Sequence, residues 1–216
     1  AGHGMLDGRR VACFSQDFAV FSGTMGEMHA RKICKILELA EKGRLPVIGI
    51  WDGDGQRPHE GVTSLGPNGE MLDLLVSCSG KVPILSIVLG TVSGTSALAA
   101  GLSDYVILGR QRGRMFMRSP YVIPEIISGE VDEDTLGGAA HHASRSGVAC
   151  MVSESESGAF DIAAEILSYL PDHTMAEPPR LSTGDKWKRK CKGMDKLVPL
   201  DSDRPDDMGG VIKEVV

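Results

Sequence analysis

Two apolar runs that each end in a glycine-rich turn constrain the fold of this chain more than any other feature. Residues 46–51 lead into the turn 52–57, and residues 82–89 lead into the small-residue turn 90–96. Short, almost wholly apolar runs are typical of parallel strands that are covered on both faces of a sheet. We therefore expect a buried parallel sheet whose strands end in tight turns.

Helical patterns separate these runs. In residues 26–42, the apolar residues Ile33, Leu37 and Ala40 recur at helical spacing, and Gly43 follows as a stop signal. Strands that alternate with helices indicate an α/β layered domain. The remaining expected elements are helices at 60–77 and 161–170 and strands at 11–14, 104–108 and 115–117.

Composition limits the classes of partner. A chain of 216 residues, 42% of them hydrophobic, can bury the core of an ordinary domain. Its net charge of -6 argues against nucleic-acid or anionic-membrane binding, so the expected partner is a protein or a small molecule. Five cysteines without a CxxC pair predict neither a disulfide framework nor a zinc ribbon and favour a cytoplasmic location. Since no run approaches the roughly 18 apolar residues of a membrane span and the start lacks a signal-peptide pattern, we expect a soluble protein.

The chain changes character after Pro171. A polar stretch with two adjacent prolines leads to a basic run at 186–192, which we expect to lie on a solvated surface. We therefore expect residues 1–171 to form a single domain and residues 172–216 to form a linker or arm.

The two glycine-rich turns are the strongest candidate site. Where a strand passes through such a turn into a helix, unpaired backbone N–H groups suit a phosphate or a developing oxyanion. A plain tight turn is the competing interpretation. Neither turn matches a Walker A or a complete GxGxxG pattern, so a nucleotide site is not supported. The residues concerned are Gly55, Gln56 and Arg57 in the first turn and Ser93, Gly94 and Thr95 in the second.

Side chains typical of acid, base or nucleophilic catalysis do not form a recognisable set. His141 and His142 are adjacent, so on a helix their side chains point about 100° apart and do not readily share a metal ion. Ser93 lacks the GxSxG pattern, and the acidic run 132–134 fits a solvated helix start better than a metal site. We therefore predict no metal site and expect each histidine to be buried or to cap a helix.

Several segments, in one order along the chain, resemble a known family. They are residues 7–12, 15–18, 21–27, 32–35, 46–50, 60–62, 136–139, 146–149 and 167–171. Together they resemble the N-terminal domain of the acyl-CoA carboxylase β-subunit family, the biotin-dependent carboxyltransferases of the crotonase superfamily. The resemblance extends over nearly the whole chain and is far more specific than a lone glycine motif.

The resemblance implies an α/β fold of the crotonase-like ββα superhelix type, a single domain with a C-terminal arm. It implies that residues 1–171 are the acyl-CoA-binding N-domain, in which backbone amides of the two turns form an oxyanion hole for the thioester. Gly94 and Thr95 fall where the family has a Gly-Gly pair, and Gly55 and Gln56 fall where it has Gly-Ala. The substrate-binding residues that the resemblance implies are Arg57, Ser93, Gly23 and Lys32.

The resemblance also implies partners. A complete family subunit has a second, C-terminal domain that faces biotin, so we expect this chain to be a fragment or a naturally split subunit that needs such a domain. Biotin would be carried on a partner protein, with a biotin carboxylase subunit and a biotin carrier in the same homo- or hetero-oligomer. The expected reaction is carboxyl transfer from carboxybiotin to an acyl group carried by coenzyme A.

Departures from the family pattern keep other functions open. Asp54 places a carboxylate near the proposed enolate, and Thr95 puts a β-branched residue where the family has glycine. The usual Thr-Gly-Pro is altered at 118–120, and Tyr121 follows. The alternatives are a biotin-dependent acyl-CoA decarboxylase of the same family and a non-catalytic assembly domain. A crotonase-type hydratase or isomerase is disfavoured because residues 94–101 contain no carboxylate to act as a base.

Overall fold

The computed structural model describes residues 1–122, 132–184, 186, 188–198, 200–201, 203 and 208–216. The chain divides into two compact units, Ala1–Pro179 and Arg180–Val216. The predicted boundary between domain and arm lies a few residues before this division, and residues 185, 187, 199, 202 and 204–207 of the predicted arm lie outside the described residues.

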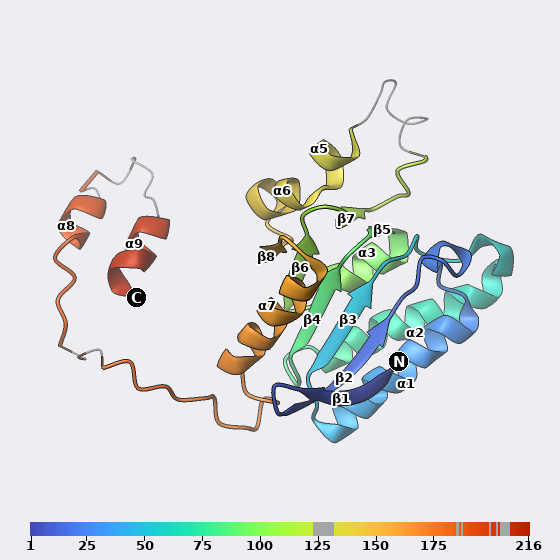
Figure 1. The fold of residues 1–216 in the computed structure, drawn as a ribbon, viewed down its shortest axis with the longest axis horizontal. Helices are drawn as coiled ribbons and strands as arrows, with labels where there is room; N and C mark the ends of the chain where they lie inside the picture. Colours follow the sequence, from blue (N-terminus) through green and yellow to red (C-terminus); the bar gives the residue numbers. More distant parts are fainter. Residues whose placement is uncertain (123–131, 185, 187, 199, 202, 204–207) are drawn as a thin grey trace. The chain divides into compact units, whose positions relative to one another are not determined.

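A six-stranded sheet forms the centre of the first unit (Figure 1). Its strands, in spatial order, are β1 (Gly2–Leu6), β2 (Arg9–Ser15), β3 (Val47–Trp51), β4 (Ile84–Val88), β6 (Tyr105–Gly109) and β8 (Met151–Ser153). The strands run parallel except for the hairpin of β1 and β2. A separate two-stranded parallel sheet pairs β5 (Thr91–Ser93) with β7 (Arg114–Phe116).

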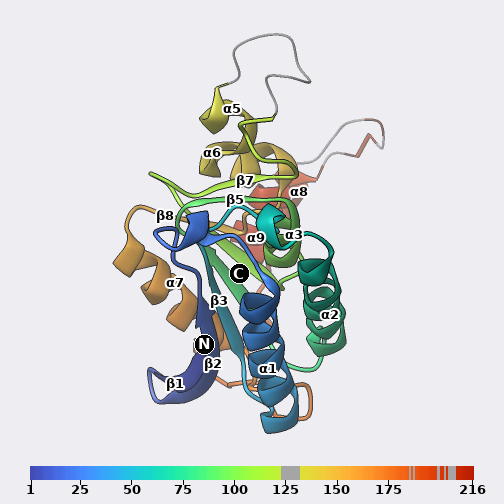
Figure 2. The same cartoon turned by 90° about the vertical axis from the view of Figure 1, so that its right-hand side faces the viewer.

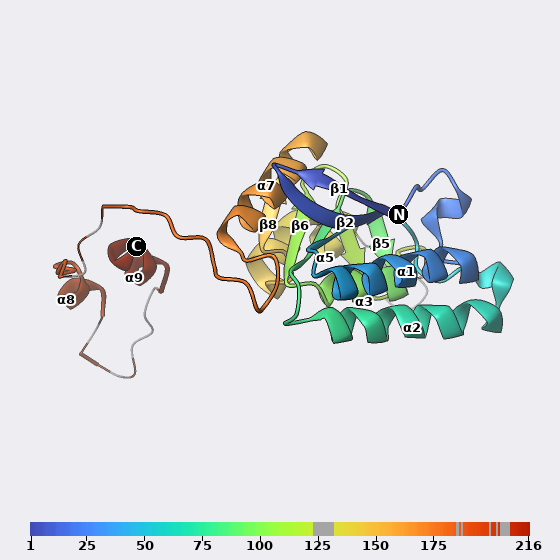
Figure 3. The same ribbon diagram turned by 90° about the horizontal axis from the view of Figure 1, so that it is seen from below.

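Helices cover both faces of the larger sheet. Helices α1 (Glu27–Gly43) and α2 (Val62–Cys78) pack side by side on one face, and α7 (Glu156–Tyr169) covers the other (Figures 2 and 3). The other helical elements of this unit are η1 (Phe21–Gly23), η2 (Pro58–Glu60), α3 (Gly94–Gly101), α5 (Glu133–Gly137), α6 (Ala139–His141) and η3 (His142–Ser146).

Alternating side chains of the central strands build two apolar layers. On β3, Val47 and Trp51 belong to the layer with α1 and α2, whereas Ile48 belongs to the layer with α7. On β4, Ile84 and Leu85 divide between the two layers in the same way. A strand covered on both faces has no solvent side, which is why these sequences are almost wholly apolar; the exception on β4, Ser86, is buried and accepts a hydrogen bond from the Trp51 side chain. The predicted buried parallel sheet and the α/β class are confirmed.

The predicted long elements are present, with differences at their ends. Helix α7 begins at Glu156, earlier than the predicted 161, because the Ser155 hydroxyl caps it by accepting a hydrogen bond from the Gly158 N–H at 3.0 Å. Helix α1 includes Gly43 and ends instead at Arg44, whose left-handed backbone has a φ of 55°. Gly43 therefore lies close to the end of the helix, as the sequence indicated, but the left-handed residue that ends it is Arg44.

The short elements were missed. Strands β1, β5 and β8 were not expected, and residues 90–96, expected to be a turn, contain β5 and the start of α3. Strands β5 and β8 have three residues each, too few to show a pattern, and β1 is not an apolar run, since it contains two glycines and a histidine. Strand β7 was predicted, but it pairs with β5 and not with the large sheet.

The described residues of the second unit include the short helices α8 (Met194–Leu197) and α9 (Met208–Val215). The Glu214 side chain accepts a hydrogen bond from the Gly193 N–H at 2.8 Å, and the Arg189 side chain donates to the Glu214 carbonyl oxygen at 3.1 Å. These bonds link the two helical segments of the predicted arm. Across the described parts of the chain, no helix combines the length and apolar character needed to cross a membrane.

Candidate functional site at two glycine turns

Three loops meet at the ends of the strands, and glycine makes the close approach possible. Gly23, Gly55 and Gly94 all have positive φ, at 64°, 62° and 52°. A Cβ on Gly23 would lie 2.1 Å from the Asp52 carbonyl oxygen and 2.6 Å from the Gly53 Cα. The loop after β2 therefore packs directly against the turn after β3, with no room for a side chain between them.

The two predicted turns touch each other. A Cβ on Gly55 would lie 2.9 Å from the Ser93 carbonyl oxygen and 3.5 Å from the Thr95 backbone nitrogen. The turn after β3 is thus in backbone contact with the turn between β5 and α3. Residues about forty positions apart in the sequence are brought to one point, as the prediction of a shared site requires.

Backbone pairing limits which amides are available at this point. Met25 donates to the Gly55 carbonyl oxygen at 2.6 Å and accepts from the Arg57 N–H at 2.9 Å, so the Gln56 N–H between them is directed away from Met25. Thr95 is in the first turn of α3, where N–H groups have no acceptor within the helix. The parallel register of β5 with β7 directs the Gly94 N–H toward β7 instead.

A buried glutamine ties the three loops together. The Gln16 side chain, at the end of β2, accepts a hydrogen bond from the Asp52 N–H at 3.1 Å. Its amide nitrogen lies 3.5 Å from both the Gly23 carbonyl oxygen and the Ser96 hydroxyl. Gln16 is only 6% exposed, so these bonds replace water that it cannot reach. The sequence analysis missed this residue, although a polar residue at the end of an apolar strand was the available signal.

Asp54 is held by hydroxyl groups. One carboxylate oxygen accepts a hydrogen bond from the Ser93 hydroxyl, and the other accepts from Ser119 at 3.2 Å. Ser93 is buried and fixed by this contact. The departure from the family pattern at Asp54 is therefore matched by Ser119, a second departure, so the carboxylate is bound within the protein.

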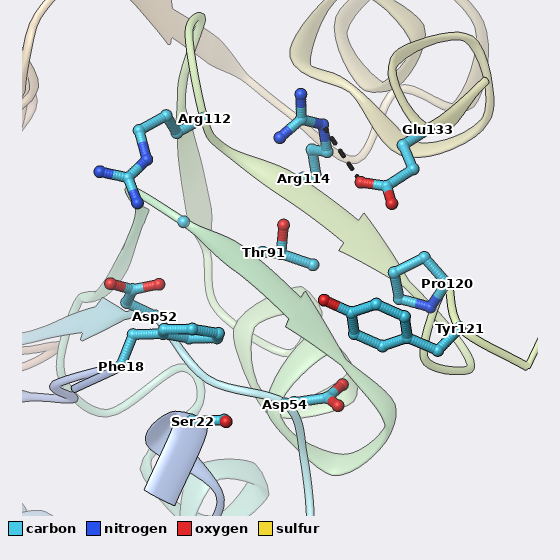
Figure 4. Close-up of a pocket in the computed structure, with 11 residues that line it drawn as sticks. Phe18, Ser22, Asp52, Asp54, Thr91, Arg112, Arg114, Pro120, Tyr121 and Glu133 are labelled. Atoms are coloured by element: carbon cyan, nitrogen blue, oxygen red, sulfur yellow. Dashed lines mark ion pairs between the residues drawn. The ribbon is translucent and has the colours of Figure 1, made fainter. Parts of the chain in front are cut away.

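A cavity of about 190 Å³ lies beside the turns (Figure 4). Asp54, Thr91 and Tyr121 line one side, and Asp52 and Arg112 line another (Figure 4). Burial raises the pKa of the Asp52 carboxyl group, and the positive charge of Arg112 partly opposes this. The cavity thus carries a mixed set of charged and hydrogen-bonding groups, which the sequence analysis did not identify apart from Asp54 and Tyr121.

Arg57 stabilises the loop between β2 and α1. Its guanidinium group donates to the Thr24 carbonyl oxygen at 2.9 Å and to Glu60 at 2.8 Å, and it lies 4.7 Å from the centre of the Phe21 ring. The Glu60 carboxylate also accepts from the Glu27 N–H at 2.5 Å, a bond that lowers the pKa of Glu60. Because these partners occupy Arg57, its expected contact with substrate stays a prediction.

Lys32 lies on the exposed side of α1. The positive charges of Arg57 and Lys32 both contribute to lowering the pKa of His29, although burial is the larger cause. The two cations therefore act on the same region of α1. Whether Lys32 binds substrate stays a prediction.

The acidic run 132–134 begins α5, as predicted. The Asp132 side chain accepts a hydrogen bond from the Thr135 N–H at 2.9 Å, and its bonds with Thr135 lower its pKa. Within the described ranges, no group of three or more His, Cys, Asp or Glu side chains is arranged to hold a metal ion.

The whole chain, residues 1–216, matches the family model described as the carboxyl transferase domain. This chain belongs to the carboxyl transferase domain family. The propionyl-CoA carboxylase carboxyltransferase subunit of Haloferax mediterranei is 39% identical over 215 residues, covering 100% of this chain and 42% of the relative. The methylmalonyl-CoA decarboxylase subunit alpha of Veillonella parvula is 36% identical with the same coverage.

Solved structures agree with this carboxyl transferase assignment. Transcarboxylase 12S, solved with methylmalonyl-CoA and methylmalonic acid bound, superposes with a TM-score of 0.86 at 32% identity. It covers 100% of this chain, and this chain covers 42% of it. The predicted crotonase-like fold is confirmed. The chain spans less than half the length of these relatives.

Proposed function

We propose that this carboxyl transferase domain binds an acyl-CoA and stabilises the enolate of its thioester for carboxyl transfer. The observation that supports the proposal is the backbone contact between the turns at Gly55 and Ser93. In this proposal the backbone amides of Gln56 and Thr95, which lie on either side of the contact, both donate to the thioester oxygen. One such donor contributes about 3 to 4 kcal/mol to a developing oxyanion.

The glycines and the amide donors have separate roles in this proposal. Gly55 and Gly94 allow the left-handed backbone that turns each strand end, and Gln56 and Thr95 supply the N–H groups. Ser93, fixed by Asp54, and Gly23, packed on Asp52, hold the turns in position. The proposal assigns no protein side chain as the base. Carboxybiotin, carried on a partner protein, would supply the carboxyl group.

The proposal includes a second domain. The chain spans about two fifths of the relatives that it matches, and the name of one of them describes a carboxyltransferase subunit. We propose that a C-terminal carboxyltransferase domain supplies the biotin-facing half of the site, with biotin carrier and biotin carboxylase subunits in one oligomer. The expected cytoplasmic location also stays a prediction.

A decarboxylase of the same family is the second candidate. The Veillonella parvula relative, named as a methylmalonyl-CoA decarboxylase subunit, is 36% identical over the same region. Loss of CO2 from a malonyl-type thioester forms the same enolate that carboxylation consumes. The turn amides would therefore stabilise it equally in either direction.

The alternative of a non-catalytic assembly domain was suggested by Asp54 and Thr95, which depart from the family pattern. Two serine hydroxyls bind the Asp54 carboxylate, which reduces its repulsion toward a developing enolate. Thr95 can donate through its backbone N–H whatever its side chain. Both observations favour a site that still stabilises an enolate.

The test uses the complete assembled protein with propionyl-CoA and with methylmalonyl-CoA. Gly94→Val adds a branched side chain where a Cβ meets open space, at the point that the thioester must approach. We expect a loss of turnover of roughly 100-fold with the fold retained. Gly80→Val, also at a positive φ with open space but remote from the turns, is the control for backbone strain.

The outcomes separate the candidates. Biotin-dependent carboxylation of propionyl-CoA supports the first function, and decarboxylation of methylmalonyl-CoA without net carboxylation supports the second. Wild-type turnover in Gly94→Val would refute the oxyanion assignment. Absence of both reactions and of acyl-CoA binding in the wild-type assembly would leave the assembly domain as the function.

A further inference from the structure

We infer that His142 is a positioning residue, which holds strand β7 and through it the turn at Gly94. The inference builds on the proposed oxyanion site and concerns a residue outside it. The chain of contacts runs from Ser146 to His142, from His142 to Met115 on β7, and from β7 to β5, which leads directly into Gly94.

The two ring nitrogens of His142 have distinct partners. Nε2 lies 3.0 Å from the Met115 carbonyl oxygen, and Nδ1 lies 2.7 Å from the Ser146 hydroxyl. A carbonyl oxygen can only accept, so Nε2 carries a proton. In the neutral ring Nδ1 is then an acceptor, and the Ser146 hydroxyl beside it also lies 3.3 Å from the His142 carbonyl oxygen, to which it can donate instead. The Met115 carbonyl oxygen therefore selects the tautomer with the proton on Nε2, and Ser146 holds the other side of the ring.

The Met115 carbonyl needs a donor from outside the small sheet. In the parallel pairing of β5 with β7, Arg114 and Phe116 are the β7 residues whose backbone groups face β5, since the Arg114 N–H donates to Gly90 at 3.1 Å. The backbone groups of Met115 face the opposite side. Met115 is only 6% exposed, and a buried carbonyl oxygen without a donor is destabilising. His142 supplies this donor on the side of β7 where Gly138 forms an antiparallel bridge to Arg114.

An unusual helical turn places the histidine. Residues His142–Ser146 form a single π-helical turn, which Gly147 ends with a φ of 71°. Such turns are rare and are frequent at functional sites. The Ser146 hydroxyl also accepts from the Val148 N–H at 3.3 Å, which holds the oxygen beside Nδ1. The turn thus fixes both the ring and the serine that contacts it.

Strand β7 is connected to both glycine turns. Val92 and Ser93 on β5 pair with Met115 and Phe116, and Gly94 follows Ser93 directly. Beyond β7, the Ser119 hydroxyl donates to Asp54, next to Gly55. A shift of β7 would therefore move the Thr95 and Gln56 amides relative to each other. The α5 and α6 segment lies beside β7 in Figure 1, and Gly138, between the two helices, bridges to Arg114 on β7.

The experiment compares variants of the complete assembled protein with propionyl-CoA labelled with ¹³C at the thioester carbonyl. His142→Leu removes the donor, whereas His142→Gln keeps an N–H near the position of Nε2. We expect His142→Leu to lower kcat by roughly 10- to 100-fold with little change in KM, and the glutamine variant to recover most of the loss. His141→Leu is the matched control. The rings of His141 and His142 are in contact, with centroids 5.4 Å apart, and in the described part of the chain His141 makes no hydrogen bond to β7.

A spectroscopic measurement distinguishes positioning from general destabilisation. Donors in an oxyanion hole lower the stretching frequency of the bound thioester carbonyl. We expect the frequency in His142→Leu to return toward its value in water, and Ser146→Ala, a change at an exposed residue, to move it in the same direction by less. Thermal unfolding of each variant shows whether it is folded at the assay temperature.

Two results would overturn the inference. In the first, wild-type protein shifts the carbonyl frequency, and folded Ser146→Ala and His142→Leu shift it as much as wild type does. His142 then does not position the turn, and the proposed function stands. If the wild-type protein binds propionyl-CoA without any shift, the oxyanion function fails and the positioning role fails with it.

Discussion

Replacing Gly55 with alanine tests the contact on which the proposed site depends. Gly55 has a φ of 62°, a conformation that costs an L-residue about 1 to 2 kcal/mol. The added Cβ would also lie 2.9 Å from the Ser93 carbonyl oxygen, closer than the 3.4 Å at which ordinary contact begins. The two turns must therefore separate by about 0.5 Å, the difference between these distances.

This displacement sets the expected loss of activity. A misplacement of 1 Å at a reacting group costs roughly 100-fold in rate, so half of that distance costs roughly tenfold. A tenfold loss corresponds to about 1.4 kcal/mol of transition-state stabilisation. Because Gln56 and Thr95 contact the oxygen most strongly in the transition state, the loss should appear in kcat more than in KM.

The assay measures kcat and KM for propionyl-CoA in the assembled protein, together with the free energy of unfolding. Gly80→Ala is the matched control, because Gly80 has a φ of 73° and its Cβ meets nothing within 4 Å. We expect backbone strain to cost each variant about 1 to 2 kcal/mol of stability, with a further loss in Gly55→Ala from the contact with Ser93, and only Gly55→Ala to lose activity. Equal activity in the two variants would refute the argument that contact between the turns creates the site.

Two further predictions concern stability. Burial raises the pKa of Asp52 above its ordinary value of 3.8, so the folded state favours the protonated carboxyl group. The stability that the protonated group contributes is full below pH 3.8 and is lost as the pH rises through the folded pKa. Asp52→Asn should therefore raise the free energy of unfolding at pH 7 relative to wild type, with the difference shrinking toward pH 3 in pH-dependent denaturation; an unchanged pH profile would contradict it. Ser155→Ala removes the N-cap of α7 and should lower the free energy of unfolding in urea by about 1 kcal/mol. Ser157→Ala, at the second residue of the helix, should lower it clearly less.

Much of the fold could be predicted because the dominant signal is local. The strands β3 and β4 lie in almost wholly apolar runs, and the helix α1 is long enough to show its amphipathic period. Strand β5 is too short for that, and its pairing with β7 depends on residues more than twenty positions away. The early start of α7 was missed although Ser155 offered a recognisable cap signal.

Part of the candidate site could also be predicted, since Gly55 and Gly94 follow apolar strands, where parallel sheets place such turns. Neither Gln16 nor His142 could be assigned a role in this way. Each acts through partners that are distant in sequence, Asp52 for Gln16 and Met115 for His142. Hydrogen bonds of this kind leave no periodic pattern in the sequence.

The sequence by itself determined the alternation of buried strands and amphipathic helices, because hydrophobic burial acts on each segment's own residues. It also determined the family, since the matching segments occur in one order along the whole chain. Only the tertiary structure decided that Gly55 contacts Ser93, that Asp54 is bound by two hydroxyls and that His142 supports β7. Those contacts join segments across the sheet, and their geometry depends on how the strands pair and the layers pack, which no single segment specifies.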